Sequence, residues 1–251
     1  MDSWRYDMSD SAQAQEPVIR RADDRGSTKR DWLESYHTFA FGGYRDLDWT
    51  RWGSLRVLNE DVIAAGAGFP PHDHENMEII TYPISGAVEH EDSSGGGGII
   101  RSGQVQRMSA GSGITHSEAN ASDTEPLHLL QIWVEPVRSG MEPSYETVTL
   151  SEPDTVMDQL DRIGGPDPSE NAVRIHQDVH LFRGHIREGS RVRTDLQENR
   201  LGWLQVISGE VHLEAHALSA SDGAGLYGPG TVDLEAEDDA HVLFFELNDV
   251  T

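Results

Sequence analysis

The sequence predicts an all-β fold of the sandwich or barrel class, built from two similar halves. Short runs rich in Val, Ile, Leu and aromatic residues recur along most of the 251 residues, with Gly, Asp and Ser between them. Residues 82–88 (YPISGAV) are similar to residues 205–211 (QVISGEV), and the GSG at 111–113 has a counterpart in the GPG at 228–230. Because the two matches occur in the same order, they indicate a duplicated fold.

Taken in order along the chain, these runs predict strands separated by turns, with one helix between the halves. We expect a disordered tail at residues 1–17 and a first domain at 18–150, with strands over 53–58, 77–82 and 127–134 and a flexible turn at 92–98. A helix is expected over Asp154–Ile163, because Val156, Leu160 and Ile163 would share one face. This helix would lie in a linker at 151–170, before a second domain at 171–251 with strands over 203–207 and 241–247.

The charge of the chain is strongly negative. It has 44 acidic and 19 basic residues, a formal net charge of −25, and Lys29 is its single lysine. Such a surface repels phosphate groups, so nucleic acids and anionic membranes are excluded as expected partners. We interpret the acidity as a sign of a halophilic source, in which high salt screens the repulsion; simple solubility is the alternative.

Two further absences limit the function. There is no cysteine, which excludes disulfides, zinc–thiolate sites and cysteine nucleophiles. No apolar run is long enough to cross a membrane, and the N-terminal residues lack the apolar segment of a secretory signal. We therefore expect a cytoplasmic protein.

Three histidines and a glutamate stand at spacings that suit a metal site. His72 and His74 would project from one face of a strand, and so would His116 and Glu118, because alternate residues of a strand share a face. If the two strands are neighbours, three imidazoles and one carboxylate converge. That donor set suits one divalent metal ion, with Fe(II) expected and Zn, Cu, Ni, Mn or Co as alternatives. Histidines on a solvated strand would be the simpler interpretation of either pair alone.

The glycines around these two pairs stand at spacings that resemble the motifs of a known protein family. Gly66 precedes His72 by six residues, and Gly111 and Gly113 precede His116, with Asn120 four residues after it. These spacings are similar to the two motifs of the cupin superfamily. The chain from about residue 18 to 250 further resembles the pirin family, most clearly in the segments at 32–41, 69–79, 88–93, 108–118 and 127–133.

The resemblance implies a bicupin, two β-barrels face to face with a short helical linker, and metal in the N-terminal barrel only. Its ligands would be His72, His74, His116 and Glu118. Glu78, a ligand in many cupins, would instead stand behind the ligands. In the second half the corresponding positions carry no histidine; they hold Asp195, Gln197, Asp233 and Glu235.

The activity that the resemblance implies is that of a quercetin 2,3-dioxygenase. Such an enzyme opens the ring of a flavonol-like aromatic with O2, and Glu118 would act as the general base. The alternative is a metal- or redox-sensing regulatory module that acts through a protein partner; another metal enzyme, such as an isomerase, is a third possibility. We expect a monomer.

The other histidines are expected to make hydrogen bonds or to lie on the surface. This interpretation applies to His37, His90 and His128, and to the pair His212 and His216, whose spacing does not suit one strand face.

Overall fold

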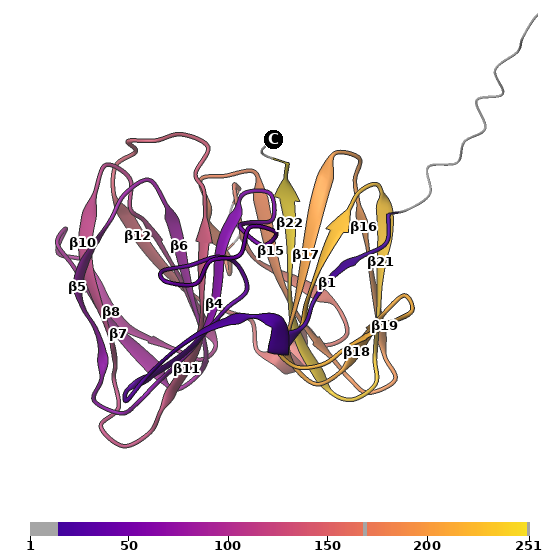
Figure 1. Cartoon of the computed structure of the whole chain (residues 1–251), viewed down its shortest axis with the longest axis horizontal. Helices are drawn as coiled ribbons and strands as arrows, with labels where there is room; N and C mark the ends of the chain where they lie inside the picture. The colour runs from indigo at the N-terminus through magenta and orange to yellow at the C-terminus, as the bar shows by residue number, and fades with distance from the viewer. Residues whose placement is uncertain (1–14, 168–169, 250–251) are drawn as a thin grey trace, which may run out of the picture.

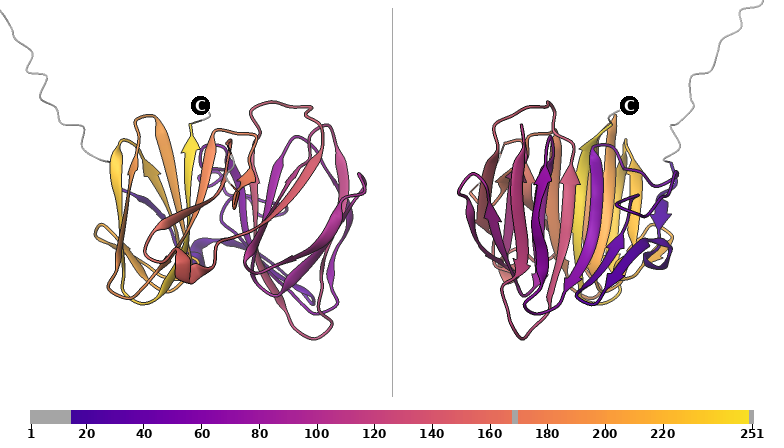
Figure 2. Two further views of the ribbon diagram at one scale, coloured as in Figure 1. Left: turned by 180° about the vertical axis from the view of Figure 1, so that it is seen from behind. Right: turned by 60° about the vertical axis from the view of Figure 1, so that its left-hand side comes forward.

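The structure, a computed structural model, describes residues 15–167 and 170–249 and consists almost entirely of β-strands. The expected tail therefore lies outside the described residues up to residue 14. Each half of the chain packs one seven-stranded sheet against one four-stranded sheet, and the halves lie side by side (Figures 1 and 2). The all-β class is confirmed. Each half is a jelly-roll sandwich of two sheets with free edges, and not a closed barrel.

The first half uses the following strands. Its large sheet has the order β12 (Ser144–Thr149), β9 (Gln104–Ser109), β6 (Glu78–Ser85), β11 (Leu127–Val134), β4 (Leu55–Ile63), β3 (Leu33–His37) and β2 (Gly26–Arg30). Its small sheet has the order β5 (Gly68–His74), β10 (Ile114–Asn120), β7 (Ala87–Asp92) and β8 (Gly97–Arg101).

The second half repeats this plan. Its large sheet has the order β1 (Val18–Arg20), β20 (Gly223–Tyr227), β17 (Arg200–Ser208), β22 (Ala240–Asn248), β15 (Val179–Ile186), β13 (Leu160–Gly165) and β14 (Val173–Arg174). Its small sheet has the order β16 (Arg191–Leu196), β21 (Gly230–Ala236), β18 (Val211–Leu213) and β19 (His216–Leu218). Two 3-10 turns complete the described elements, η1 (Ala22–Asp24) and η2 (Pro153–Thr155).

The strand orders match in the five inner positions of the large sheets and in the small sheets, as expected for a duplicated fold. Both edges of the large sheets differ. At one edge, β14 follows β13 and is parallel to it, whereas β2 precedes β3 and is antiparallel to it. β1 precedes the whole first half in sequence, yet it pairs with β20 at the edge of the second sheet, where the first sheet has β12 (Figure 1). Asp222 fixes this crossing segment by accepting hydrogen bonds from the Arg21 side chain and the Ala22 backbone. The chain from residue 18 to 20 thus belongs to the second sandwich.

The expected helix over Asp154–Ile163 is wrong. Only η2 is helical there, and Leu160–Gly165 forms β13, which pairs with β15. The three-residue spacing that resembled one helix face places Leu160 and Ile163 on opposite faces of a strand. Leu160 packs against the core of the second sandwich and Ile163 enters the core between the halves. Burial on both faces of β13 outweighs the local helical pattern.

The largest core cluster joins the two halves. Strand alternation directs Leu130 and Ile132 of β11 and Leu243 and Phe245 of β22 into this one cluster, between the two seven-stranded sheets. The other face of β22 fills the second sandwich, where Val242 and Phe244 lie in a continuous apolar core. The other face of the first large sheet is different, because it carries polar side chains around a cavity. Within the described residues, no helix is long and apolar enough to span a membrane.

Candidate metal centre

The structure brings His72, His74 and His116 together on the inner face of the small sheet. β5 and β10 are antiparallel neighbours, and the register pairs His116 with His72 and Ile114 with His74. One ring nitrogen from each of the three imidazoles lies within 4.8 Å of the others. The Nε2 atoms of His116 and His72 are 3.1 Å apart. The strand alternation used to predict the cluster is therefore the alternation that forms it.

Hydrogen bonds to the far nitrogens orient two of these rings. Nδ1 of His72 donates to the carbonyl oxygen of Pro70 at 2.9 Å, and Nδ1 of His116 lies 3.0 Å from Nε2 of His90. Because a carbonyl oxygen can only accept, Nδ1 of His72 carries the proton and its Nε2 lone pair is directed into the cluster. His116 presents its Nε2 lone pair in the same way in the tautomer whose Nδ1 donates to His90. His74 is held by an edge-on contact with Trp133, with ring centroids 4.8 Å apart.

The surroundings keep two of the imidazoles, those of His74 and His116, neutral. Burial lowers the pKa of His116 to about 3 and that of His74 to about 4, and the neighbouring His72 adds to both shifts. Neutral imidazoles offer a lone pair to a cation at neutral pH without first losing a proton.

The spacing of the nitrogens fits a divalent transition metal. Two nitrogens bound at about 2.1 Å and at right angles are about 3 Å apart. The Nε2 atoms of His72 and His116 have this separation, 3.1 Å. Three imidazoles on one side of an ion leave its remaining positions for a carboxylate or for substrate.

Glu118 lies on β10, the strand of His116, and lines the cavity together with His72 and His74. Its two carboxylate oxygens accept hydrogen bonds from the Thr81 hydroxyl at 3.2 Å and the Gln131 amide at 2.7 Å. Burial raises its pKa, and these two bonds oppose the shift. The group of donor atoms within 4.8 Å of one another holds the three histidines without Glu118. Its assignment as the fourth ligand stays a prediction.

The cavity between the two sheets has a volume of about 370 Å³. Its apolar wall includes Leu33, Phe41, Phe69 and Trp133. Its polar wall is formed by the large sheet, where the side chains of Thr28, Ser35, His37, Asn59, Asp61 and Gln131 line the space. A cavity with apolar and polar walls beside a metal centre suits an aromatic molecule that carries hydroxyl groups.

The comparisons with known proteins identify the family. A family model described as Pirin matches residues 19–134, and one described as a quercetinase C-terminal cupin domain matches residues 163–247. A protein of Escherichia coli K12 named quercetin 2,3-dioxygenase is 39% identical over 229 residues, 91% of this chain and 97% of that protein. The chain belongs to the pirin family.

Relatives and solved structures of pirins agree with this. A pirin-like protein of Caulobacter vibrioides is 35% identical over 224 residues, 89% of this chain and 96% of that protein. The crystal structure of the E. coli pirin YhhW in complex with nickel(II) is similar with a TM-score of 0.88 and 37% identity, covering 94% of this chain and 100% of that one. The pirin resemblance and the bicupin architecture expected from the sequence are therefore confirmed.

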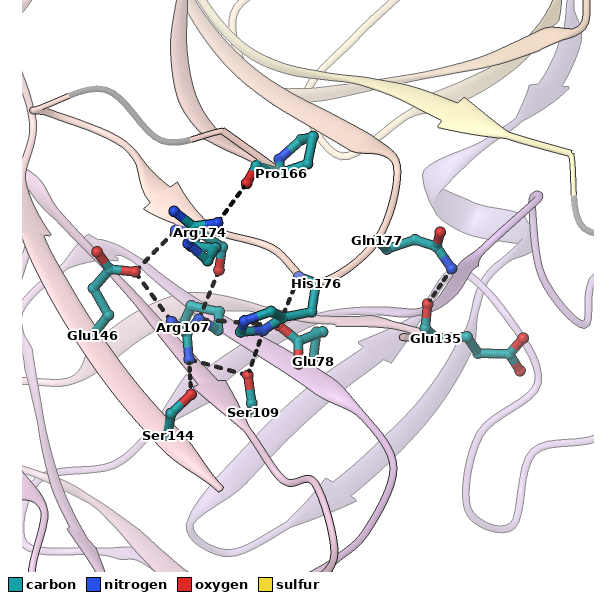
Figure 3. Close-up of polar contacts among 10 residues, drawn as sticks. All are labelled: Glu78, Arg107, Ser109, Glu135, Ser144, Glu146, Pro166, Arg174, His176 and Gln177. Atoms are coloured by element: carbon teal, nitrogen blue, oxygen red, sulfur yellow. Dashed lines mark hydrogen bonds and ion pairs between the residues drawn. The ribbon is translucent and has the colours of Figure 1, made fainter. Parts of the chain in front are cut away.

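Glu78 lies away from the histidines, contrary to its expected place behind them. Thr81, which contacts Glu118, is three residues further along β6, and an odd spacing places the two side chains on opposite faces. The Glu78 carboxylate, 1% exposed, accepts hydrogen bonds at 3.1 Å from the backbone N–H and from Nδ1 of His176 in the second half. Glu78 therefore belongs to the contact between the halves (Figure 3).

Arg107 stands at the centre of that contact. Its guanidinium donates to Ser144, to Glu146 and to the backbone oxygen of Arg174, and Figure 3 shows it beside the pair formed by Glu78 and His176. These bonds join β6, β9 and β12 of the first half to the segment around β14 of the second half.

The five other histidines that were expected to make hydrogen bonds or to lie on the surface have polar partners. His37 bonds to Thr28 and Asn59, His90 to His116, and His128 to Glu60. His212 and His216 are half-exposed and face the glutamates Glu237 and Glu16, respectively.

In the second half, the positions that the sequence repeat matched to the ligands face away from the interior, and Val232 and Leu234 occupy the inner face of β21. Asp233 pairs with Arg193, Glu235 pairs with Arg191, and Asp195 accepts from Thr231. Their side chains therefore contact arginines and a hydroxyl group, while the interior of that sandwich is filled with apolar residues.

Sequence reasoning missed the polar wall of the cavity. The signal was present in β4, whose apolar run is interrupted by Asn59 and Asp61, two polar residues at alternate positions. Both are buried. On a strand that is otherwise buried and apolar, such a pair marks a face that serves a purpose other than packing.

Proposed function

We propose that this pirin is a metal-dependent dioxygenase that opens the ring of a flavonol-like substrate with O2. The observation that carries the proposal is the cluster of three histidines, two of which line a cavity that also contains the buried carboxylate of Glu118. The names of the relatives support the reaction class, and the nickel complex of the E. coli pirin supports a divalent ion. Fe(II) remains our expectation for the resident metal.

The metal, held by His72, His74 and His116 with Glu118 as the proposed fourth ligand, would lower the pKa of a bound substrate hydroxyl and so favour its oxidation. Glu118 has the second role of accepting the proton of that hydroxyl. Its raised pKa suits a general base, because a carboxylate of ordinary pKa is a weaker proton acceptor. Thr81 and Gln131 hold the carboxylate in place during this transfer.

The apolar wall of the cavity would bind the ring system of the substrate. Phe41, Phe69 and Trp133 present aromatic surfaces to the cavity, where they would hold a planar substrate and exclude water from it. Exclusion of water strengthens the electrostatic effect of the metal and of Glu118.

The test is to supply quercetin to the protein after loading it with Fe(II), Ni(II) or Mn(II), in separate samples. We expect consumption of O2 with release of carbon monoxide, and loss of both after treatment with a chelator. Elemental analysis of the purified protein should find one metal ion per chain. A loaded protein that consumes no O2 with any flavonol would contradict the proposal.

The regulatory alternative gains no support from the comparisons. The monomeric state, the cytoplasmic location and the halophilic source stay predictions, as do the domain boundaries at 150 and 171.

A further inference from the structure

Asp61 is a buried acidic side chain on the polar wall of the cavity. It lies on β4 between β3 and β11, opposite Ser35 and Leu129 in the register of these strands. It is 3% exposed and lines the cavity that His72, His74 and Glu118 also line. Among the described residues, none is within hydrogen-bonding distance of its Oδ1 atom.

The neighbouring polar groups of this wall are already paired. His37 bonds to Asn59 and to Thr28, both at 2.9 Å. Both oxygens of Glu118 accept hydrogen bonds. A buried acceptor without a partner destabilises the fold, and such groups in native proteins commonly have a functional reason. Asp61 thus offers an open hydrogen-bonding position to a molecule in the cavity.

The chemistry of the carboxyl group indicates what that molecule presents to it. Burial raises the pKa of Asp61 to about 7, with Glu118 and Glu60 adding to the shift and the hydroxyl of Ser35 opposing it. Both the ionised and the protonated form are therefore accessible near neutral pH. A hydroxyl group pairs with either form, because it can both donate and accept a hydrogen bond. An ether or an unsubstituted ring cannot donate to the ionised form.

We propose that Asp61 binds a substrate hydroxyl other than the one at the metal centre and thereby selects polyhydroxylated aromatics over aromatics with a single hydroxyl group. This inference rests on the proposed function for the metal-bound end of the substrate. The apolar wall holds the ring system between these two ends, and Asp61 determines which ring substitution is accepted.

The experiment compares the binding of two flavonols to metal-loaded protein under anaerobic conditions, by calorimetry. Quercetin carries several hydroxyl groups, and 3-hydroxyflavone keeps only the one that would bind at the metal. We expect the wild type to prefer quercetin, and Asp61→Leu, which keeps the branched shape and removes the polar atoms, to reduce the ratio of the two affinities roughly 10- to 100-fold. The reduction should come from weaker binding of quercetin, with 3-hydroxyflavone bound as before.

Glu60→Gln is the matched control. Glu60 is the adjacent residue of β4 and faces away from the cavity, toward Arg25 and His128. Loss of its charge should lower stability without altering the ratio. Asp61→Asn provides a second variant in case Asp61→Leu fails to fold, and its neutral amide should still lower the ratio at least threefold, because bonds to ionised groups are roughly twice as strong.

The outcomes separate this proposal from the one before it. A wild type that binds neither flavonol would overturn both. A wild type that binds and oxidises both flavonols, with the same ratio in the Asp61 variants, would overturn the role of Asp61 and leave the dioxygenase proposal intact.

Discussion

Replacement of Glu118 by Gln should remove turnover without loss of stability. The change keeps the shape of the side chain and removes its negative charge. A positioned general base contributes about 10²–10⁴-fold to a rate, so the barrier should rise by about 3 to 5 kcal/mol. Metal should be retained in part, because the three histidines remain.

The effect on stability follows from the surroundings of Glu118. Two hydrogen bonds to an ionised group, from Thr81 and Gln131, become bonds to a neutral amide, a loss of about 1 kcal/mol each. Against this, a fully buried charge is removed, whose desolvation costs several kcal/mol. The metal-free variant should therefore unfold at the same or a higher temperature than the metal-free wild type. Because burial raises the pKa of Glu118, the difference should grow as the pH rises above the ordinary value of a glutamate.

Glu78→Gln is the control, and we expect it to lower stability while turnover is retained. Its partners are His176 and, at 4.0 Å, Arg107, so removal of the charge should weaken the contact between the halves by about 1 to 3 kcal/mol. Turnover and metal content should stay near those of the wild type. Steady-state O2 consumption, elemental analysis and thermal unfolding of both variants measure all three quantities. Wild-type turnover by Glu118→Gln with full metal would refute the general-base role; an empty site in Glu78→Gln alone would show that the carboxylate was wrongly chosen.

Three further predictions concern metal, salt and pH. His72→Ala or His74→Ala should lower the metal content at equal protein concentration, as measured by elemental analysis; full occupancy in both would exclude them as ligands. Thermal midpoints should climb as KCl rises from about 0.1 M to above 1 M, where the screening length falls to about 3 Å, and unchanged midpoints would mean that the net charge of −25 has another cause. Burial lowers the pKa of His241 to about 3, so its contribution to stability is present above about pH 6.5 and is lost as the pH falls toward 3. His241→Gln should therefore show a smaller fall in midpoint between pH 7.5 and 5 than the wild type does.

The metal centre could be predicted because its geometry is local. His72 and His74 are two residues apart, as are His116 and Glu118, and strand alternation alone places each pair on one face. The one long-range fact that was needed, the pairing of β5 with β10, was supplied by the glycine spacings of the family motifs. The duplicated fold was also predictable, because the two halves contain similar segments in the same order.

The features that were missed depend on contacts between distant segments. The exchange of β1 into the second sheet has no signal in its three residues, because the edge that it covers is formed by β20, some 200 residues later. The wall at Asn59 and Asp61 likewise requires the register of β4 with its neighbours. Glu78 was expected near the ligands because of its place in the cupin motif, but it lies on the face of β6 opposite Thr81 and contacts His176 of the second half.

The same strand alternation explains why the interiors of the two halves differ among the described residues. In both halves, the outer face of the large sheet enters the shared core, through Leu130 on β11 and Phe245 on β22. The inner face is then free to differ. In the second half, the inner face of β22 carries Phe244, which packs in an apolar core. In the first half, Gln131 occupies the inner face of β11 and donates a hydrogen bond to Glu118. Buried polar groups cost stability, so the first sandwich depends on the shared core more than the second does. The inner face of the first half therefore carries the histidine cluster and a cavity, whereas the inner face of the second half carries an apolar core.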